Sequence, residues 1–485
     1  MKQIFLSLSI VCCLNCSSQN NEGNIWYFGD SAGINFNSGQ PVAITDGALN
    51  SEECSSSICD SNGNLQLYAG SKTITGINIA VFNKQHHLML NGDSINGNYS
   101  ITQGALILPY PNNFNKYLLF SIGTIDSNPV NHLLFSIIDM NLDGGLGSVV
   151  QKNILLADTV TEKMIAVRHA NGRDWWVIAH KDNSNEYITY IIEPNGLKGP
   201  FRQSIGTNLS GFDLIGQMVI SEDGSKLCLA GVGGTLDISD FDRCAGRISN
   251  LQSIADISPT QQYYGCSFSP NGTRLYVSVL DTLFQYDLTA SNIKASKQII
   301  RIETNSEIEL GQHKIANDLK IYIGNAFGYS FPNNLFDSSN MNLSVINYPD
   351  SLGLACNFMP YSVSLGGRRS LGGLPNNPNY SLGALTGGPC DTLDVGGINV
   401  IRKDDFAVTL YPNPNNGNFI LTYHLKTKAD FLIKDVVGRT VFSKSLIGFD
   451  GSETILTSNL CNNIYFWKVI ADGEISAQGK IVVIK

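Results

Sequence analysis

This chain of 485 residues has few charged residues and few long apolar runs. Past residue 16 it has no cysteines at the C-x-x-C spacing of a metal site. Only 15% of the residues are charged and the net charge is -9, without a long basic run. Neutralising phosphates requires clustered Lys and Arg, so we expect no nucleic-acid partner. The lack of C-x-x-C pairs past the N-terminal segment disfavours zinc, and we expect neither a metal nor another cofactor.

What the chain has in quantity favours an all-β fold. Gly occurs 47 times, and Asn, Ser and aromatic residues are abundant. This mixture is typical of many short strands joined by tight turns, and it disfavours a helical enzyme core. The length is too great for one ordinary compact domain, so we expect two or more units.

The first 18 residues are predicted to be a signal peptide. Lys2 supplies the positive start, residues 4–14 form an apolar stretch, and Ser18 is a small residue suited to cleavage. A rival interpretation makes Cys16 a lipidated cysteine. Past this segment no run reaches the ~18 apolar residues of a membrane-spanning helix, so we expect no transmembrane segment in the mature chain. Three of the 11 cysteines lie in the segment, and the other eight can form disulfides whose connectivity the spacing leaves open.

A unit of two apolar strands around a turn rich in Asn, Asp and Gly recurs along the chain. Asn-Gly and Asp-Gly suit hairpin turns because they tolerate positive φ. The gaps between successive turns are 46 to 59 residues, which is the length of a propeller blade. A β-helix or a two-sheet sandwich is the alternative, although neither explains the even spacing. The six turns are centred on Gly63, Asn113, Gly172, Gly224, Gly272 and Asp318.

A seventh blade is predicted from the two ends of the repeat region. Residues 357–374 start like an inner strand but lack the strands that should follow. The sequence NIWYFGDSAGINFN near the N-terminus reads as two strands around a Gly-Asp turn. Closing the ring with N-terminal strands would cover both open sheet edges, which otherwise invite aggregation.

Several stretches, in order, resemble a Bacteroidetes family of secreted propellers over roughly residues 23–388. They are NIWYFGDSAGINFNSG, ITDGALN, DSNGNLQLY, IIDMNLDGGLG, TEKMIAVRHANGRDWWVIAHK, FSPNGTRLYVS and GGLPNNPNYSLG. The resemblance implies a WD-repeat-like, seven-bladed β-propeller, which we place at residues 23–375, on exported or cell-surface proteins. It implies no settled activity.

The C-terminal part has a different pattern. Residues 376–405 are rich in Pro, Gly and Asn and are predicted to be a linker. Residues 406–485 show the alternation of a small β-sandwich of about seven short strands. Three motifs in it resemble the type IX secretion C-terminal sorting domain, type A, which implies recognition by the type IX secretion machinery and delivery to the cell surface or the medium. The motif residues are Tyr411, Pro412, Asn413, Pro414, Gly417, Gly438, Gly479 and Lys480.

Three patterns that resemble catalytic or metal sites are better explained as turns or paired strands. Ser31 lies in a G-x-S-x-G pattern, but the residues after it alternate like a strand rather than forming the helix that a nucleophile elbow needs. Residues 139–144 open like a calcium loop but lack the carboxylate at its twelfth position. His169 and His180 flank one hairpin without a third zinc ligand, which favours hydrogen-bonded histidines. We therefore predict no catalytic residue.

The mouth of the central channel is the binding site that a propeller offers by its architecture. Residues at the start of each innermost strand should line it, and their mixture of carboxylate, amide and phenol suits a polar ligand, or equally a water-filled channel. We expect a binding or adhesion module for an extracellular glycan or protein; the alternative is a secreted lactonase-like or polysaccharide lyase-like enzyme, because the fold alone cannot choose. The predicted channel residues are Glu53, Gln103, Glu162, Lys163, Gln217, Tyr264 and Gln312.

Overall fold

The computed structural model forms two compact units, Met1–Asp391 and Thr392–Lys485, which are described separately. The predicted signal peptide lies outside the described residues, and so does most of the second half of the predicted linker. No helix in the described part of the chain has the length and apolar character needed to cross a membrane. The described residues are 21–125, 130–256, 262–328, 335–388, 390, and 407–485 without 412, 414, 426–427, 447–449, 458–459 and 472–473.

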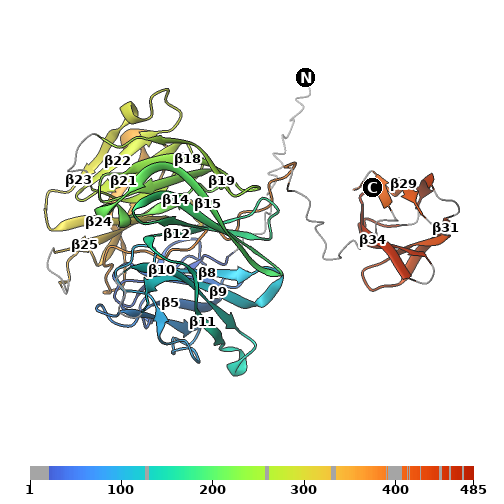
Figure 1. Ribbon diagram of the computed structural model, residues 1–485, viewed down its shortest axis with the longest axis horizontal. Helices are drawn as coiled ribbons and strands as arrows, with labels where there is room; N and C mark the ends of the chain where they lie inside the picture. The colour runs from blue at the N-terminus through green and yellow to red at the C-terminus, as the bar shows by residue number, and fades with distance from the viewer. Residues whose placement is uncertain are drawn as a thin grey trace, which may run out of the picture. The chain divides into compact units, whose positions relative to one another are not determined.

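The first unit contains, within the described residues, seven antiparallel sheets, which follow one another in chain order from blue to orange in Figure 1. One sheet has three strands: β1 (Ile25–Phe28), β2 (Ala32–Asn35) and β3 (Val42–Ile44). Three four-stranded sheets follow: β4 (Ser55–Cys59), β5 (Leu65–Ser71), β6 (Asn78–Asn83), β7 (Ile95–Asn96); β8 (Ala105–Tyr110), β9 (Asn113–Thr124), β10 (Asn131–Asp139), β11 (Ser148–Ala157); β12 (Val160–Arg168), β13 (Trp175–Lys181), β14 (Ser184–Glu193), β15 (Gly196–Leu209).

Three further four-stranded sheets and four short 3-10 helices complete the unit. The sheets are β16 (Met218–Ile220), β17 (Lys226–Ala230), β18 (Leu236–Asp242), β19 (Arg247–Ser253); β20 (Tyr263–Phe268), β21 (Arg274–Val279), β22 (Thr282–Asp287), β23 (Gln298–Ile302); β24 (Ile308–Ile315), β25 (Ile321–Phe327), β26 (Asn342–Ile346), β27 (Phe358–Ser364). The 3-10 helices are η1 (Asp143–Gly145), η2 (Gly211–Leu214), η3 (Lys294–Ser296) and η4 (Gly353–Cys356).

The first strand of each four-stranded sheet lies at the inner edge, and successive first strands lie side by side. β4 contacts β8, β8 contacts β12, and the contacts continue through β16 and β20 to β24. β8 and β16 are mostly apolar, and β4, although it contains three serines, is buried at every position. Continuous burial is expected where both faces of a sheet pack against neighbouring sheets. The seven sheets are therefore the blades of a β-propeller, and the predicted fold class is confirmed.

All six predicted hairpin turns join the first and second strands of a blade. Local Asx turns stabilise five of them, because a side-chain oxygen at the start of the turn accepts backbone N–H groups further on. Asp60 accepts from Asn62 N at 2.9 Å and from Asn64 N at 2.9 Å. Asn271 accepts from Thr273 N at 3.0 Å in the same way. The spacing of turn residues was thus a sound guide to the number of blades.

Both ends of the repeat region close the ring, but the C-terminal contribution begins later than predicted. Residues 358–364 are the outer strand β27, not an inner strand, and their half-exposed side chains suit an outer position. The inner place of the seventh blade is taken by residues 369–388, here called the closing segment. Its Gly372 O accepts from Gln312 N at 2.8 Å, and its Gly373 N donates to Glu52 O at 3.1 Å. A side chain on Gly311 would put its Cβ 2.1 Å from Gly372 O, so only glycine allows this approach.

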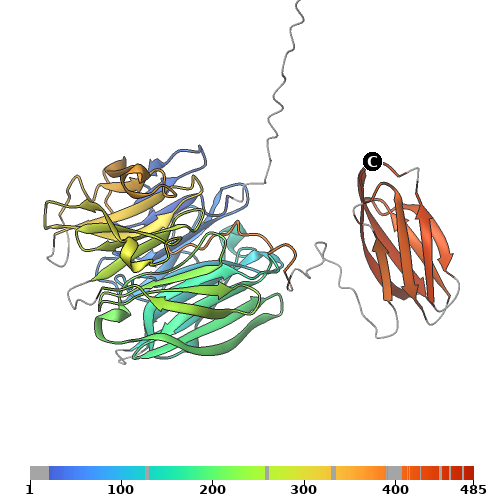
Figure 2. The same ribbon diagram turned by 90° about the horizontal axis from the view of Figure 1, so that it is seen from above.

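The second unit is a β-sandwich of seven strands within the described residues, whose two layers are visible in Figure 2. Its sheets enclose one apolar core that includes Phe431 and Trp467. One sheet consists of β28 (Ala407–Tyr411), β29 (Asn418–His424) and β32 (Asp450–Leu456); the other consists, in spatial order, of β31 (Thr440–Leu446), β30 (Ala429–Lys434), β33 (Asn463–Ala471) and β34 (Glu474–Val483).

Candidate functional site

The predicted channel residues occupy equivalent places in successive blades, because the same backbone hydrogen bond recurs between them. Gln103 N donates to Glu162 O at 3.1 Å, and Gln217 N donates to Tyr264 O at 2.9 Å. Gln312 N makes the corresponding bond, 2.8 Å long, to Gly372 O of the closing segment. These bonds bring Gln103 next to Glu162 and Gln217 next to Tyr264.

The three glutamine side chains are buried and bond to neighbouring backbone rather than to open space. Gln103 accepts from Met218 N at 2.8 Å and donates to Met218 O at 2.9 Å. Gln217 makes the same pair of bonds with His313, at 2.9 and 3.2 Å. Buried amides must be paired, and here the pairing joins non-adjacent parts of the ring. These amides hold the inner strands together.

Lys163 is buried against the loop that contains η2, although its position in the chain predicted a ligand contact at the channel mouth. Its fully buried ammonium donates to Asp213 O at 2.8 Å, to Leu214 O at 3.2 Å and to Ile215 O at 2.8 Å. Burial lowers the pKa of Lys163 to about 8. This lysine thus satisfies the carbonyl groups at the end of η2.

Two carboxylates and a phenol form a polar cluster at the end of the channel where the inner strands begin. Tyr264 donates its hydroxyl to the Glu53 carboxylate. Glu162 Oε2 accepts from Thr102 N at 3.0 Å and from Thr102 Oγ1 at 2.8 Å. Burial, followed by the nearby Glu162, raises the pKa of Glu53 well above its usual value, and burial also raises that of Glu162. Burial and Glu309 raise the pKa of the adjacent Glu52 to about 7.

The other patterns considered in the sequence have structural partners. Ser31 lies in the β1–β2 turn with φ of 55° and donates to Leu49 O at 3.3 Å. His169 Nε2 lies 3.0 Å from Cys244 O, and His180 Nδ1 lies 2.8 Å from Lys181 O, so both histidines are hydrogen-bonded. Within the residues that the structure describes, no group of three or more His, Cys, Asp or Glu side chains could hold a metal ion.

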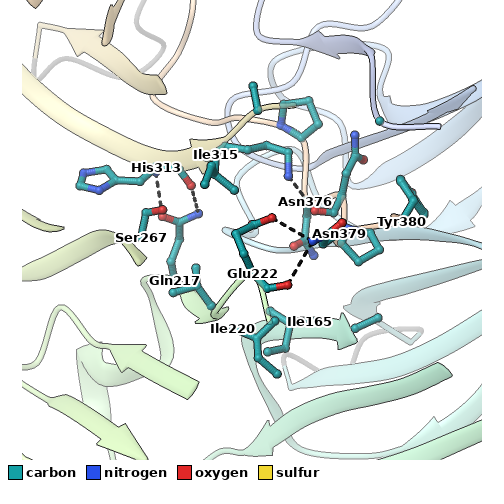
Figure 3. A pocket seen from close by; sticks show the side chains of 18 of the residues that line it. Ile165, Gln217, Ile220, Glu222, Ser267, His313, Ile315, Asn376, Asn379 and Tyr380 are labelled. Carbon is teal, nitrogen blue, oxygen red and sulfur yellow. Dashed lines mark hydrogen bonds between the residues drawn. The ribbon is translucent and has the colours of Figure 1, made fainter. Parts of the chain in front are cut away.

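A cavity of about 120 Å³ lies at the opposite end of the inner strands, where they run into the hairpin turns. Figure 3 shows its walls, with Gln217 and His313 on one side and Asn376, Asn379 and Tyr380 on the other. Two of the predicted channel residues, Gln103 and Gln217, line it. The other five predicted channel residues are not part of its lining.

One carboxylate and one ammonium group line this pocket. Glu222 Oε2 accepts from Asn379 Nδ2 at 2.9 Å, and Lys314 Nζ donates to Asn377 O at 2.6 Å. Burial raises the pKa of Glu222 and lowers that of Lys314 to about 8. The two groups are half-buried. They come from β24 and from the turn after β16, so different blades bring opposite charges to one cavity.

The closing segment forms one wall of the pocket and is tied to several blades. Tyr380 OH donates to Ile107 O at 2.7 Å, and Arg168 donates to Tyr380 O at 2.8 Å. Arg243 donates to Gly383 O at 2.5 Å. A disulfide joins Cys244 to Cys390. Residues 376–388, predicted as the start of a linker, are therefore part of the propeller unit, because polar and aromatic side chains anchor them.

Sequence reasoning missed Glu222, Lys314 and the asparagines of the closing segment. Glu222 and Lys314 both stand directly before or within a predicted hairpin turn, in the sequences SEDGS and HKIAND. That position was the available signal, since the end of every inner strand faces the same mouth of the channel. The predicted channel residues all lie toward the strand starts, at the other end.

In the second unit the first and last sorting motifs are joined directly. Asn413 Nδ2 donates to Lys480 O at 2.9 Å, and Val482 N donates to Asn413 Oδ1 at 2.8 Å. Gly479 faces Trp467 across the strand pair, and a Cβ on Gly479 would lie 2.7 Å from the indole ring. Pro412 and Pro414 of the first motif lie outside the described residues.

The remaining motif glycines take turn conformations. Gly417 has φ of 95° and Gly438 has φ of 86°, which favour glycine. Gly438 N donates to Asp435 O at 2.9 Å, and Asp435 also pairs with Arg439 at 2.7 Å. These motif residues therefore stabilise turns within the sandwich.

Comparison with known proteins identifies the second unit. Residues 409–485 match the family described as the secretion system C-terminal sorting domain. A search of curated protein sequences gave no significant match.

Solved structures similar to the chain include several propellers. A Bacteroides fragilis protein provisionally named a 6-phosphogluconolactonase has 11% identity and a TM-score of 0.46, covering 73% of this chain and 98% of its own. The periplasmic gluconolactonase of Pseudomonas aeruginosa has 12% identity and a TM-score of 0.37, covering 79% and 96%. A β-propeller domain from Myceliophteria thermophila has 11% identity and a TM-score of 0.37, covering 63% and 94%. Similarities this weak carry no argument about this chain.

The sheet order defines the first unit as a seven-bladed β-propeller. The family match defines the second as a type IX sorting domain, which directs the chain to the cell surface or the extracellular space. The resemblance of residues 406–485 to a type IX C-terminal sorting domain is thereby confirmed.

Proposed function

We propose that the propeller is an extracellular binding module, an adhesion or capture domain for a glycan or protein, which its sorting domain delivers across the outer membrane. The observation that carries this proposal is the bonded frame of the channel. Its glutamines, Lys163 and the closing segment are hydrogen-bonded to one another or to backbone. Such a frame is rigid, and rigid scaffolds present binding surfaces at a low entropy cost.

A secreted enzyme, lactonase-like or polysaccharide lyase-like, is the second candidate, and the Glu53–Glu162–Tyr264 cluster favours it. Ionisable groups with shifted pKa values gather at catalytic sites, although structural networks shift pKa values as well. The pairing of Glu53 with Tyr264 and of Glu162 with Thr102 supports the structural role.

Binding of the purified full-length protein to arrays of glycans and of extracellular proteins tests the proposal. We expect saturable binding to at least one class of ligand, lost when the protein is heat-denatured. The same preparation is incubated with gluconolactone and with polygalacturonate to follow turnover. Turnover that Glu53→Gln abolishes would favour the enzyme, and failure to bind any array component would contradict the binding module.

A further inference from the structure

The pocket at the turn end of the channel has unused hydrogen-bonding capacity of two opposite kinds. Within the described residues Lys314 Nζ makes one hydrogen bond, to Asn377 O at 2.6 Å, and lies 5.7 Å from the centroid of the Trp26 ring, which leaves two of its three N–H donors for a ligand. The Glu222 carboxylate is bonded by Asn379 through Oε2, at 2.9 Å, and Oε1 can accept or orient a further donor. A ligand that both donates and accepts on neighbouring atoms would therefore meet both groups.

Two asparagines of the lining are already paired, which narrows the ligand chemistry. Asn376 donates to Met164 O at 2.8 Å and accepts from Gln103 at 3.2 Å. Asn379 accepts from Ser381 N at 3.0 Å. The carboxylate and the ammonium are the charged groups open to a ligand, beside the neutral His313 imidazole, whose two ring nitrogens have no hydrogen-bond partner within the described residues. Apolar contacts come from side chains such as Ile165 and Ile220 (Figure 3).

The size of the cavity sets an upper limit on the ligand. A water molecule takes ~30 Å³ of liquid volume, so about 120 Å³ has room for about four water-sized groups. That room admits two neighbouring hydroxyl groups with the ring carbons that carry them, which is one edge of a sugar ring, while the rest of the ring would lie outside the pocket.

We infer that this pocket binds one neutral sugar unit through adjacent hydroxyl groups, one accepting from Lys314 and the next donating to Glu222. This inference rests on the proposed binding function and names its ligand class. An amino-acid zwitterion also carries both charges, but burying a charged group requires several hydrogen bonds to it. Lys314 and Glu222 offer each charge a single protein partner, whereas a hydroxyl is satisfied by one or two bonds.

Calorimetric titration of the purified full-length protein with glucose, galactose, mannose and N-acetylglucosamine tests the inference. We expect at least one sugar to bind with a Kd of ~10 mM or tighter. Glu222→Gln and Lys314→Gln should each weaken binding at least tenfold, because each removes the charge while keeping a polar side chain at the position. The paired surface variants Glu193→Gln and Lys198→Gln should leave the affinity unchanged.

Melting temperatures equal to that of the wild type show that the variants fold. The inference is overturned if glycine or alanine binds in place of the sugars, or if a sugar binds with equal affinity to both pocket variants. It is also overturned if no sugar binds while the arrays reveal a ligand, in which case the proposed binding function stands. Failure on the arrays and with the sugars would contradict both.

Discussion

The propeller and the sorting domain use their characteristic residues in opposite ways. In the sorting domain the motif residues lie next to one another in space: Asn413 bonds the last strand, and Gly479 makes room for Trp467. In the propeller, residues at equivalent positions of neighbouring blades bond to each other, and the open pocket is lined by two of them, Gln103 and Gln217, together with residues that follow. A motif whose residues contact one another within one small domain can be recognised in the sequence. An inner-strand position predicts only that a residue lies near the channel, and it does not predict what the side chain contacts.

The largest expected effect tests whether export depends on the second unit. Deleting residues 406–485 should abolish export and leave the propeller in the periplasm, because the sorting domain is removed while the closing segment and its disulfide are kept. Cell fractionation with an antibody to the propeller measures this, and resistance of the truncated protein to limited proteolysis serves as the folding control. Truncated protein in the medium at the wild-type level would show that the propeller carries its own export signal.

A single side chain should have a large effect on export. Gly479→Val would force a side chain against the Trp467 ring, and such overpacking costs ~1–3 kcal/mol. We expect a severalfold lower extracellular fraction together with a lower melting temperature for the sandwich. Gln478→Val, one residue earlier on β34, is the matched control and should be exported normally. Equal export of both variants would mean that the Gly479–Trp467 contact is unimportant for sorting.

Removing the disulfide at the end of the closing segment should have an intermediate effect, confined to the propeller. Replacing Cys244 and Cys390 together by Ser removes the cross-link that holds the end of the segment, and native disulfides contribute ~2–4 kcal/mol. Hydrogen exchange at residues 376–388 should accelerate, with little change in the inner strands. Cys461→Ser, at an exposed free cysteine of the other unit, is the control. Unchanged exchange in the double variant would show that hydrogen bonds alone hold the segment.

The smallest effect concerns the acidic end of the channel. The pKa of Glu52 is raised from 4.5 to about 7, so its favourable contribution to stability is complete below pH 4.5 and is lost as the pH rises through about 7. Thermal unfolding of Glu52→Gln should therefore depend less on pH across this window than that of the wild type. Glu307→Gln, at an exposed position, should follow the wild type. Identical pH profiles for all three proteins would mean that Glu52 is exposed to water in the folded protein.

The sequence allowed the blade count, the hairpins and the two-unit plan to be predicted, because turn chemistry and strand alternation are local. It also located the inner-strand starts, since equivalent positions recur in every repeat. It placed the C-terminal closure at residues 357–374, which overlaps the closing segment only at 369–374, and it predicted 376–388 as linker, because a Pro- and Gly-rich stretch resembles a linker until its partners are known. Lys163 and Glu222 show the same limit: whether a polar side chain faces the channel or bonds to a neighbouring loop depends on contacts between distant segments.

Separate roles for the two units are tested most directly by transplanting the second one. Residues 392–485 are joined to a periplasmic carrier protein that has its own signal peptide, and the carrier is quantified in cells, on the surface and in the medium. The carrier should appear outside the cell, and the Gly479→Val form of the same fusion should stay in the periplasm. A carrier that stays in the periplasm while the full-length chain is exported would contradict the assignment of export to the sorting domain alone.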